Sequence, residues 1–141
     1  MKKTDPALSL YLAWLVALVG TLGSLYYSEI RQLVPCLLCW YQRIVLYPLV
    51  IIIPIGLVLR DRYLPYYCLA LSLIGLLIAS YHNLLQFGLI PEKLAPCTAG
   101  VSCATKQIVA LHIVTIPILS FLAFLLISLA MAVIIKQESK R

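Results

Sequence analysis

Long apolar runs separated by short polar segments are the main feature of this chain. Four runs approach the roughly 20 residues that an α-helix needs to cross about 30 Å of hydrocarbon. They cover about residues 7 to 27, 40 to 59, 64 to 85 and 108 to 135. The pattern predicts an all-α membrane protein, a four-transmembrane-helix bundle that forms one domain over residues 1–141. Any chemistry then belongs in the short loops or at the bilayer surface.

The composition agrees with a membrane protein and excludes an ordinary soluble domain. Of the 141 residues, 63% are hydrophobic and only 11% are charged, and the mean hydropathy is +1.02. The first run follows Lys2 and Lys3 as a signal peptide would. It is longer than the usual apolar stretch of about 7 to 15 residues and lacks an obvious cleavage site. We therefore expect it to be retained as the first helix.

The formal net charge of +6 does not indicate nucleic-acid binding, because the basic residues are scattered among loops. Membrane topology explains them better. With a cytoplasmic N-terminus, seven Lys and Arg side chains lie inside and four outside, which is the bias that membrane proteins favour. The inner set is Lys2, Lys3, Arg60, Arg62, Lys136, Lys140 and Arg141, and the outer set is Arg31, Arg43, Lys93 and Lys106. We expect both termini to be cytoplasmic.

This orientation places two cysteine-containing loops outside the cytoplasm, one before the second helix and one before the fourth. Thiols are oxidised and disulfides persist in such compartments. The opposite orientation would place four of the five cysteines in a reducing compartment. The cysteine usage therefore favours the same topology as the charges.

The stretch from Pro35 to Arg43 has the residues of a redox centre. Cys36 and Cys39 are separated by two residues at the start of an apolar run. A helix N-terminus favours a thiolate and keeps such a pair reactive. Arg43 follows Cys39 by four residues, so its permanent charge shares a helix face with that sulfur and stabilises its thiolate. A structural disulfide and half of a zinc site are the alternative interpretations.

A second cysteine pair, Cys97 and Cys103, lies in the loop before the fourth helix. Five residues separate the two thiols, and Gly100 among them permits a turn, so a small disulfide loop is expected. Its small polar neighbours leave this bond exposed to attack by a thiolate of another protein. A purely structural disulfide is the alternative.

Three further residues are candidates of lower specificity. His82 lies near the outer end of the third helix, close in depth to Cys36 and Cys39, and an ionisable residue in an apolar span is a functional candidate. The alternative is a histidine solvated at the headgroups. His112 is a weaker case of the same kind. Cys68 lies near the inner membrane surface, where an inert buried thiol is expected and acylation is the alternative.

Together the two pairs form a possible electron path. A soluble dithiol would reduce the Cys97/Cys103 bond, and the released thiolate would attack the Cys36/Cys39 bond. The chain has no haem motif, Gly-rich nucleotide loop or flavin fingerprint, so the final acceptor is expected to be small and lipophilic, as a quinone is. Zinc binding by the four cysteines is disfavoured, because the second pair has five intervening residues instead of two to four. No metal is expected.

The run Pro-Cys-Leu-Leu-Cys-Trp-Tyr-Gln-Arg at residues 35–43, followed by an outer loop with a second pair, resembles the bacterial DsbB family of disulfide-bond formation membrane proteins. The short loop between Cys97 and Cys103 is similar to that of its BdbC-type branch. The resemblance covers the whole four-helix layout. It implies that Cys97 forms a mixed disulfide with a thioredoxin-fold, DsbA-like partner, and that Cys103 then exchanges with Cys36.

The same resemblance implies roles for the residues nearest the membrane. Cys39 would pass electrons to ubiquinone or menaquinone, and Arg43 would assist at the quinone oxygens. His82 lies where family members often have a histidine, which implies a further contribution to quinone binding. Where the best-known members have a long loop between the second pair, this chain has five residues. That difference bears on how far Cys97 and Cys103 separate during exchange.

The expected function is that of a quinone-dependent protein-disulfide oxidoreductase in the bacterial cytoplasmic membrane. It would reoxidise an extracytoplasmic thioredoxin-fold oxidase and so support disulfide formation in exported proteins. Two alternatives remain from the residues alone. One is a passive membrane scaffold with disulfide-stapled loops, and the other is a reductase of the vitamin K epoxide reductase type.

Overall fold

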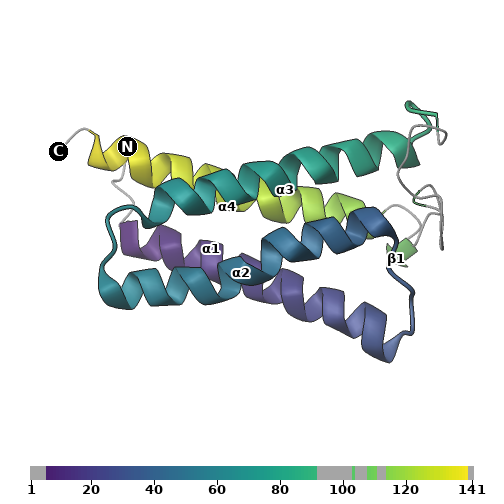
Figure 1. The fold of residues 1–141 in the computed structure, drawn as a ribbon, viewed down its shortest axis with the longest axis horizontal. Coiled ribbons are helices and arrows are strands. Elements are labelled where there is room, and N and C mark those ends of the chain that lie inside the picture. The colour runs from purple at the N-terminus through teal and green to yellow at the C-terminus, as the bar shows by residue number, and fades with distance from the viewer. Residues whose placement is uncertain (1–5, 92–102, 104–107, 111–113, 140–141) are drawn as a thin grey trace.

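The structure, a computed structural model, describes residues 6–91, 103, 108–110 and 114–139. Its main elements are four helices, α1 (Pro6–Leu25), α2 (Leu37–Leu59), α3 (Leu64–Gln86) and α4 (Ile116–Glu138) (Figure 1). All four are long and apolar enough to cross a membrane. The predicted all-α, four-helix membrane bundle is therefore confirmed.

The helices form a closed ring in chain order. Each packs against its neighbours in the sequence, and α4 returns to pack against α1. The start of α1, the turn between α2 and α3 and the end of α4 lie at one end of the bundle (Figure 1). The segment before α2 and the end of α3 lie at the other end. Cys36, just before α2, and the described residue Cys103 lie together at this end.

The first span continues beyond α1 into a short π-helix, η1 (Tyr26–Ile30). The hydropathy pattern placed the end of this span at about residue 27. The extra turn forms because the wider hydrogen-bonding pattern continues to the backbone N–H of Arg31, which donates to the carbonyl oxygen of Tyr26 at 3.1 Å.

Helix α2 begins at Leu37, with Cys36 as the extended N-cap residue. The apolar run predicted the span from about residue 40, whereas the cysteine motif predicted a helix that begins at the pair, as the structure shows. Pro48 and Pro54 lie inside the helix without ending it. Arg60 adopts a left-handed conformation with φ of 52° and ends the helix by donating its N–H to Gly56 and Leu57 carbonyl oxygens.

The predicted start of the fourth helix at about residue 108 is wrong. Strand β1 (Ile108–Ala110) pairs antiparallel with strand β2 (Val114–Thr115), and α4 begins only at Ile116. Short apolar, β-branched stretches suit a strand as well as a helix, so hydropathy did not separate them. Pro117 fits in the first turn of α4, where its missing N–H is not needed. His112 lies outside the described residues.

The core lies between the four helices and depends on close approaches between them. On α3, Gly75 leaves room for the fully buried ring of Phe124 from α4, since an added Cβ would lie 2.3 Å from the ring atom Cε1. The Trp14 indole N–H donates to the Val50 carbonyl oxygen at 3.0 Å and joins α1 to α2. Cys68 is a free cysteine and is fully buried in this core.

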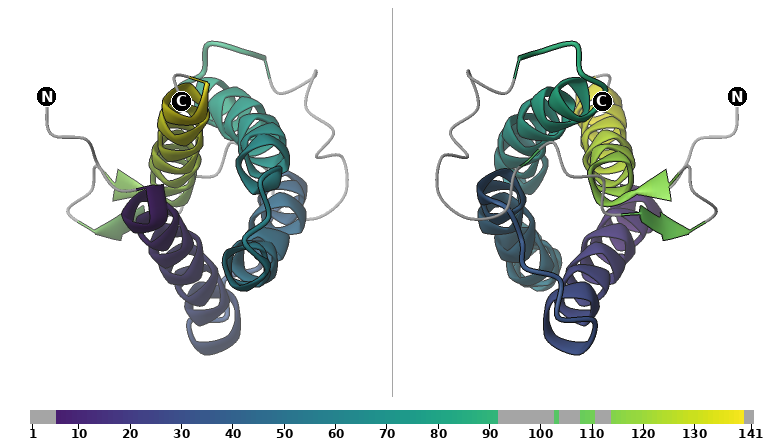
Figure 2. Two further views of the ribbon diagram at one scale, coloured as in Figure 1. Left: turned by 90° about the vertical axis from the view of Figure 1, so that its left-hand side faces the viewer. Right: turned by 90° about the vertical axis from the view of Figure 1, so that its right-hand side faces the viewer.

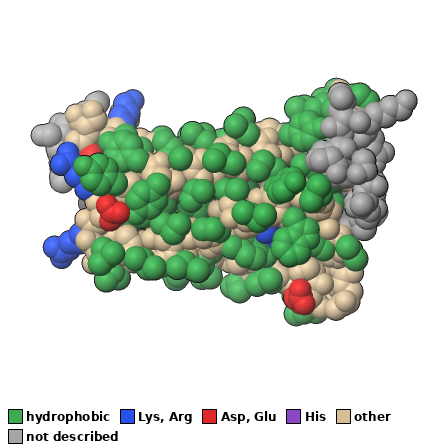
Figure 3. All heavy atoms as spheres, in the orientation of Figure 1, with side chains coloured by type: hydrophobic (Ala, Val, Ile, Leu, Met, Phe, Trp, Pro, Cys, Tyr) green, Lys and Arg blue, Asp and Glu red, His purple; other side chains and the backbone are tan. Residues whose placement is uncertain are grey.

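The outside of the bundle is apolar over its middle. Figure 3 shows hydrophobic side chains covering the central part of one face, with most of the visible charged side chains near the two ends. Large exposed apolar residues occur on every helix, among them Leu12, Ile44, Ile51, Leu77 and Leu126. Such a surface suits contact with lipid and would be unfavourable in water.

Candidate redox site

The two cysteines before and within the first turn of α2 lie side by side. The Sγ atoms of Cys36 and Cys39 are 3.2 Å apart, and both cysteines are free. The helical turn causes this proximity, because residues three apart lie on one face. A disulfide has an S–S distance of about 2.05 Å. A small side-chain rotation would therefore close the bond, which is the behaviour expected of a redox pair.

The two sulfurs face different surroundings. Cys36 is buried with Leu38, Leu85 and Cys103 in a small cluster at the end of the bundle. Cys39 packs against the edge of this cluster and, unlike Cys36, also lines a cavity. Cys103 is buried and disulfide-bonded, while its predicted partner Cys97 lies outside the described residues. One sulfur of the pair is thus directed to the loop disulfide and the other to the cavity.

His82 on α3 lies between the two cysteine pairs. Its Nε2 atom is 3.8 Å from the Sγ of Cys36 and 3.2 Å from the carbonyl oxygen of Cys103. Its Nδ1 atom is 3.2 Å from the side-chain nitrogen of Gln42. An amide nitrogen can only donate, so Nδ1 accepts from Gln42, and Nε2 donates to the Cys103 carbonyl oxygen. That N–H is directed to Cys36 and Cys103.

Gln42 was not identified from the sequence. It is buried in α2, with 5% of its surface exposed, and it also lines the cavity. The sequence feature that could have identified it is an amide within an apolar span, because a buried amide needs a polar partner. Its contact with His82 joins α2 to α3 directly below the cysteine pair.

The environment of Cys36 favours its thiolate. A hydrogen bond from Cys39 is the main cause that holds the pKa of Cys36 well below the usual thiol value, and the hydrogen bond from His82 acts in the same direction. Burial opposes both. The sequence-based interpretation placed the stabilised thiolate on Cys39, next to Arg43. In the structure the two sulfurs lie within hydrogen-bond distance of each other, and Arg43 lines the same cavity as Cys39.

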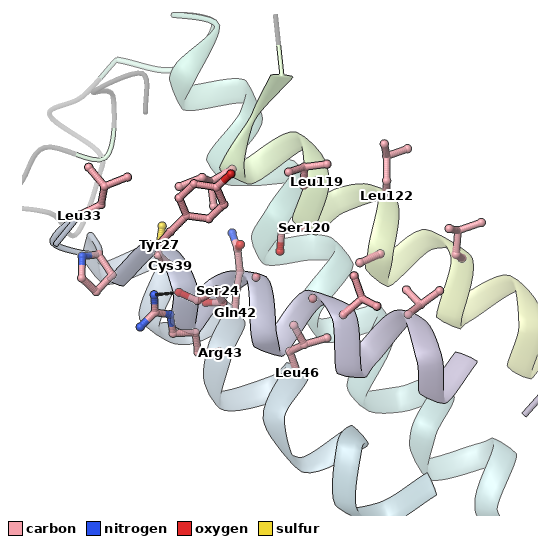
Figure 4. A pocket seen from close by; sticks show the side chains of 18 of the residues that line it. Ser24, Tyr27, Leu33, Cys39, Gln42, Arg43, Leu46, Leu119, Ser120 and Leu122 are labelled. Carbon is pink, nitrogen blue, oxygen red and sulfur yellow. Dashed lines mark hydrogen bonds between the residues drawn. The ribbon is translucent and has the colours of Figure 1, made fainter. Parts of the chain in front are cut away.

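The cavity beside Cys39 has a volume of about 480 Å³ and lies between α1, α2 and α4 (Figure 4). Such a volume is typical of sites for small organic ligands. Its walls are mostly leucine, valine and glycine residues, and its polar groups gather at the end near Cys39. These polar residues are Ser24, Tyr27, Gln42, Arg43 and Ser120.

Arg43 is the charged residue among those that line the cavity. Its Nη2 donates to the Ser24 carbonyl oxygen at 3.1 Å, which ties α2 to α1. Its guanidinium carbon lies 5.6 Å from the centre of the Trp40 ring, a cation–π contact. These contacts hold a cation beside Cys39 in a mostly apolar space. The site therefore suits a ligand with an apolar body and polar oxygens at one end.

The structure brings most of the predicted site residues together. Cys36, Cys39, His82 and Cys103 form one cluster, and Arg43 joins it through the cavity. His82 is not among the described residues that line that cavity. It lies next to Cys36 instead.

Comparisons with known proteins agree with this site. Residues 6–134 match the family model described as disulfide bond formation protein DsbB. The chain belongs to the DsbB family. It is 42% identical over 131 residues to disulfide bond formation protein C of Bacillus subtilis, covering 93% of this chain and 95% of that protein. The resemblance inferred from the two cysteine pairs is thus confirmed.

Two further relatives carry similar names. The chain is 44% identical over 126 residues to the probable disulfide formation protein C of Halalkalibacterium halodurans, covering 89% of this chain and 92% of that protein. It is 46% identical over 119 residues to the probable disulfide formation protein of Chlamydia muridarum, covering 84% and 86%. No solved structure matches the chain. Family membership and the helices together identify a multi-pass membrane protein with a protein-disulfide oxidoreductase role in disulfide formation.

Proposed function

We propose that this protein reoxidises an extracytoplasmic, thioredoxin-fold, DsbA-like dithiol oxidase and passes the electrons to a membrane quinone, either ubiquinone or menaquinone. The observation that carries the proposal is that the two sulfurs of the Cys36/Cys39 pair have different neighbours. Cys36 adjoins Cys103 and His82, while Cys39 opens to the apolar cavity beside Arg43. A relay between a protein dithiol and a lipophilic acceptor needs one sulfur on each side.

The first exchange takes place at the loop pair. A thiolate of the partner attacks Cys97 of the Cys97/Cys103 disulfide, which forms a mixed disulfide and releases Cys103 as a thiolate. Cys103 then attacks the Sγ of Cys36 in the oxidised Cys36/Cys39 pair. The Cys36–Cys39 bond breaks, and Cys39 leaves as a thiolate on the cavity side. The burial of Cys103 in one cluster with Cys36 supports this step.

Two further attacks complete the transfer. The second partner thiolate attacks the mixed disulfide, so the partner leaves oxidised and Cys97 is released. Cys97 attacks Cys103, which regenerates the loop disulfide and releases Cys36 as a thiolate. Two electrons have then moved from the partner dithiol to the Cys36/Cys39 pair, and two protons have been released from the partner. The Nε2–H of His82 is positioned to stabilise the Cys36 thiolate as it leaves.

The cavity residues fit a quinone. The space is apolar for a ring and isoprenoid tail, and the Arg43 guanidinium lies among its lining residues with Cys39. A bound quinone would accept two electrons and two protons. Arg43 would hold a quinone oxygen by a charge-assisted hydrogen bond and keep Cys39 as a thiolate. We assign His82 to the exchange at Cys36 instead of to quinone binding, because it contacts that sulfur.

The proposed location is the bacterial cytoplasmic membrane, with both cysteine loops on the extracytoplasmic side. The two termini and the turn between α2 and α3 carry seven Lys and Arg residues, against four in the segments on the cysteine side. This excess supports the proposed orientation. Disulfides at Cys97/Cys103 and Cys36/Cys39 also persist only outside a reducing compartment.

The decisive experiment combines the purified protein in lipid nanodiscs with a reduced thioredoxin-fold dithiol protein and a quinone, without oxygen. We expect catalytic quinone reduction that Cys39→Ser abolishes and the matched Cys68→Ser variant retains. Absence of turnover, or turnover that survives in Cys39→Ser, would support the passive scaffold. Net reduction of the oxidised partner by a quinol under the same conditions would support the reductase alternative.

A further inference from the structure

Three metal-binding side chains converge at the reduced cysteine pair. The Sγ atoms of Cys36 and Cys39 and a ring nitrogen of His82 all lie within 4.8 Å of one another. The Sγ of Cys36 is 3.2 Å from that of Cys39 and 3.8 Å from Nε2 of His82. The ligands come from α2 and α3, 46 residues apart in the sequence. Zinc binding by the four cysteines is a different arrangement, which the loop spacing disfavours.

These distances approach those of a zinc site. Tetrahedral Zn²⁺ with bonds of about 2.3 Å to sulfur and about 2.05 Å to nitrogen requires separations of about 3.8 Å between sulfurs and about 3.6 Å between sulfur and nitrogen. The Cys36 to His82 separation of 3.8 Å already fits. The two sulfurs are 3.2 Å apart, and the Cys39 sulfur lies within 4.8 Å of a His82 ring nitrogen, so a rotation of the Cys39 side chain is needed to bring both separations to these values. The carbonyl oxygen of Cys103 lies 3.2 Å from Nε2 and is a further oxygen near these ligands.

The surroundings supply what a buried metal site needs. Two thiolates offset the charge of Zn²⁺, so no net charge is buried although Cys36 and His82 are almost fully enclosed. Coordination by Nε2 moves the imidazole proton to Nδ1, which then needs an acceptor. A half-turn of the Gln42 amide places its oxygen where its nitrogen now contacts Nδ1 at 3.2 Å. Such an outer partner orients a histidine ligand.

We propose that the reduced protein binds one Zn²⁺ ion through Cys36, Cys39 and His82, and that the ion holds the pair in its reduced form. On binding, the Cys39 thiol releases its proton, Cys36 binds as the thiolate that its surroundings already favour, and no electrons move. A sulfur that ligates the metal is not free to form a disulfide. The oxidised pair lacks thiolates and cannot provide the site. The metal and the disulfide are therefore mutually exclusive states of the same two sulfurs.

Cobalt is a suitable probe, because Co²⁺ replaces Zn²⁺ and its absorption reports thiolate ligands and tetrahedral geometry. The full chain, reduced and freed of reductant without oxygen, is titrated with Co²⁺ and then with Zn²⁺. We expect one equivalent of Co²⁺ to produce thiolate charge-transfer bands and intense d–d bands, which Zn²⁺ then removes. The same spectrum is expected in the Cys97→Ser/Cys103→Ser variant and in Cys68→Ser.

The variants at the site give the opposite expectation. Cys39→Ser should lose the spectrum, and His82→Ala should weaken Co²⁺ binding at least about tenfold, with Gln42→Leu weakening it by about 10- to 100-fold. Circular dichroism establishes that each variant retains its helices. An unchanged affinity in His82→Ala, a spectrum that disappears in the Cys97→Ser/Cys103→Ser variant, or no spectrum in the reduced chain would each overturn the proposal.

A separate measurement tests whether bound Zn²⁺ protects Cys36 and Cys39 from oxidation. One equivalent of Zn²⁺ should slow the oxidation of Cys36 and Cys39 by a general thiol oxidant by about tenfold or more, and a chelator should restore the rate. Oxidation at an unchanged rate with the metal bound would contradict the locking role. These experiments need neither quinone nor partner protein, so their outcome is independent of the proposed oxidase function.

Discussion

The imidazole Nε2 of His82 lies 3.8 Å from the Sγ of Cys36, although 46 residues separate them in the chain. The same nitrogen is 3.2 Å from the Cys103 carbonyl oxygen. One N–H group therefore lies near both the Cys36 sulfur and the backbone of Cys103. It is nearer to the carbonyl oxygen than to the sulfur.

Replacing His82 with alanine should slow the exchange between Cys103 and Cys36. A lost hydrogen bond to a charged sulfur is worth roughly 1.4 kcal/mol, which is about a tenfold lower rate. The measurement is rapid-quench alkylation of the mixed disulfide during a single turnover. Quinone affinity should not change, because His82 contacts Cys36. A normal exchange rate with weakened quinone binding would restore the role implied by the family resemblance.

The thiolate at Cys36 predicts an unusual pH profile. Since hydrogen bonds lower the pKa of Cys36, its alkylation in the reduced protein should stay fast as the pH falls through 8 and 7, where an ordinary thiol with a pKa of about 8.5 loses reactivity. In Cys39→Ala the main hydrogen bond is absent, so the midpoint should rise; in His82→Ala it should rise less. Peptide mapping after iodoacetamide treatment measures this. Equal midpoints in all three proteins would contradict the assigned cause.

Arg43 should affect the quinone step alone. Arg43→Ala removes the cation from the cavity beside Cys39. We expect about a tenfold higher apparent KM for quinone, because one charge-assisted hydrogen bond to the quinone is lost. Exchange with the partner dithiol should be largely intact. Arg43→Lys is the matched control, because it keeps the charge without the planar guanidinium. Unchanged quinone affinity and turnover in Arg43→Ala would count against its role.

Much of this architecture follows from local sequence features. Four apolar runs predicted four spans, and the spacing of Cys36, Cys39 and Arg43 predicted a redox pair with a nearby cation. His82 was placed at the right depth because helix length fixes depth. In each case the relevant physical information lies within one segment of the chain.

The rest depended on how the helices pack. The rotation of α2 against α3 decides that Cys36 faces Cys103 while Cys39 faces the cavity, and no local pattern fixes that rotation. The same packing buries Gln42 against His82. The sequence shows only that Gln42 is an amide within an apolar span and does not show its partner. The start of α4 at Ile116 was missed because the apolar residues of β1 and β2 extend the hydropathic run without being helical.

Packing in the core gives a prediction that is independent of redox chemistry. In Gly75→Ala the new Cβ would lie 2.3 Å from the Phe124 ring, so the ring must move within a filled core at a cost of about 1 to 3 kcal/mol. Gly23→Ala is the control, since its Cβ meets nothing within 4 Å. Thermal unfolding in detergent should show a lower midpoint for Gly75→Ala alone. Equal midpoints would mean that α3 and α4 are less closely packed than described.

Filling the cavity should block the acceptor without touching the chemistry. Ala123 on α4 lines the space opposite Cys39, and Ala123→Phe places a ring in a volume of about 480 Å³. We expect a several-fold higher KM for quinone, with the Cys103 to Cys36 exchange unchanged, because neither Cys36 nor Cys103 is among the described residues that line the cavity. Leu129→Phe is the control on the same helix, at an exposed position facing lipid. If both variants use quinone as the native protein does, the acceptor binds elsewhere, and the proximity of Cys39 to this cavity has no role in electron transfer.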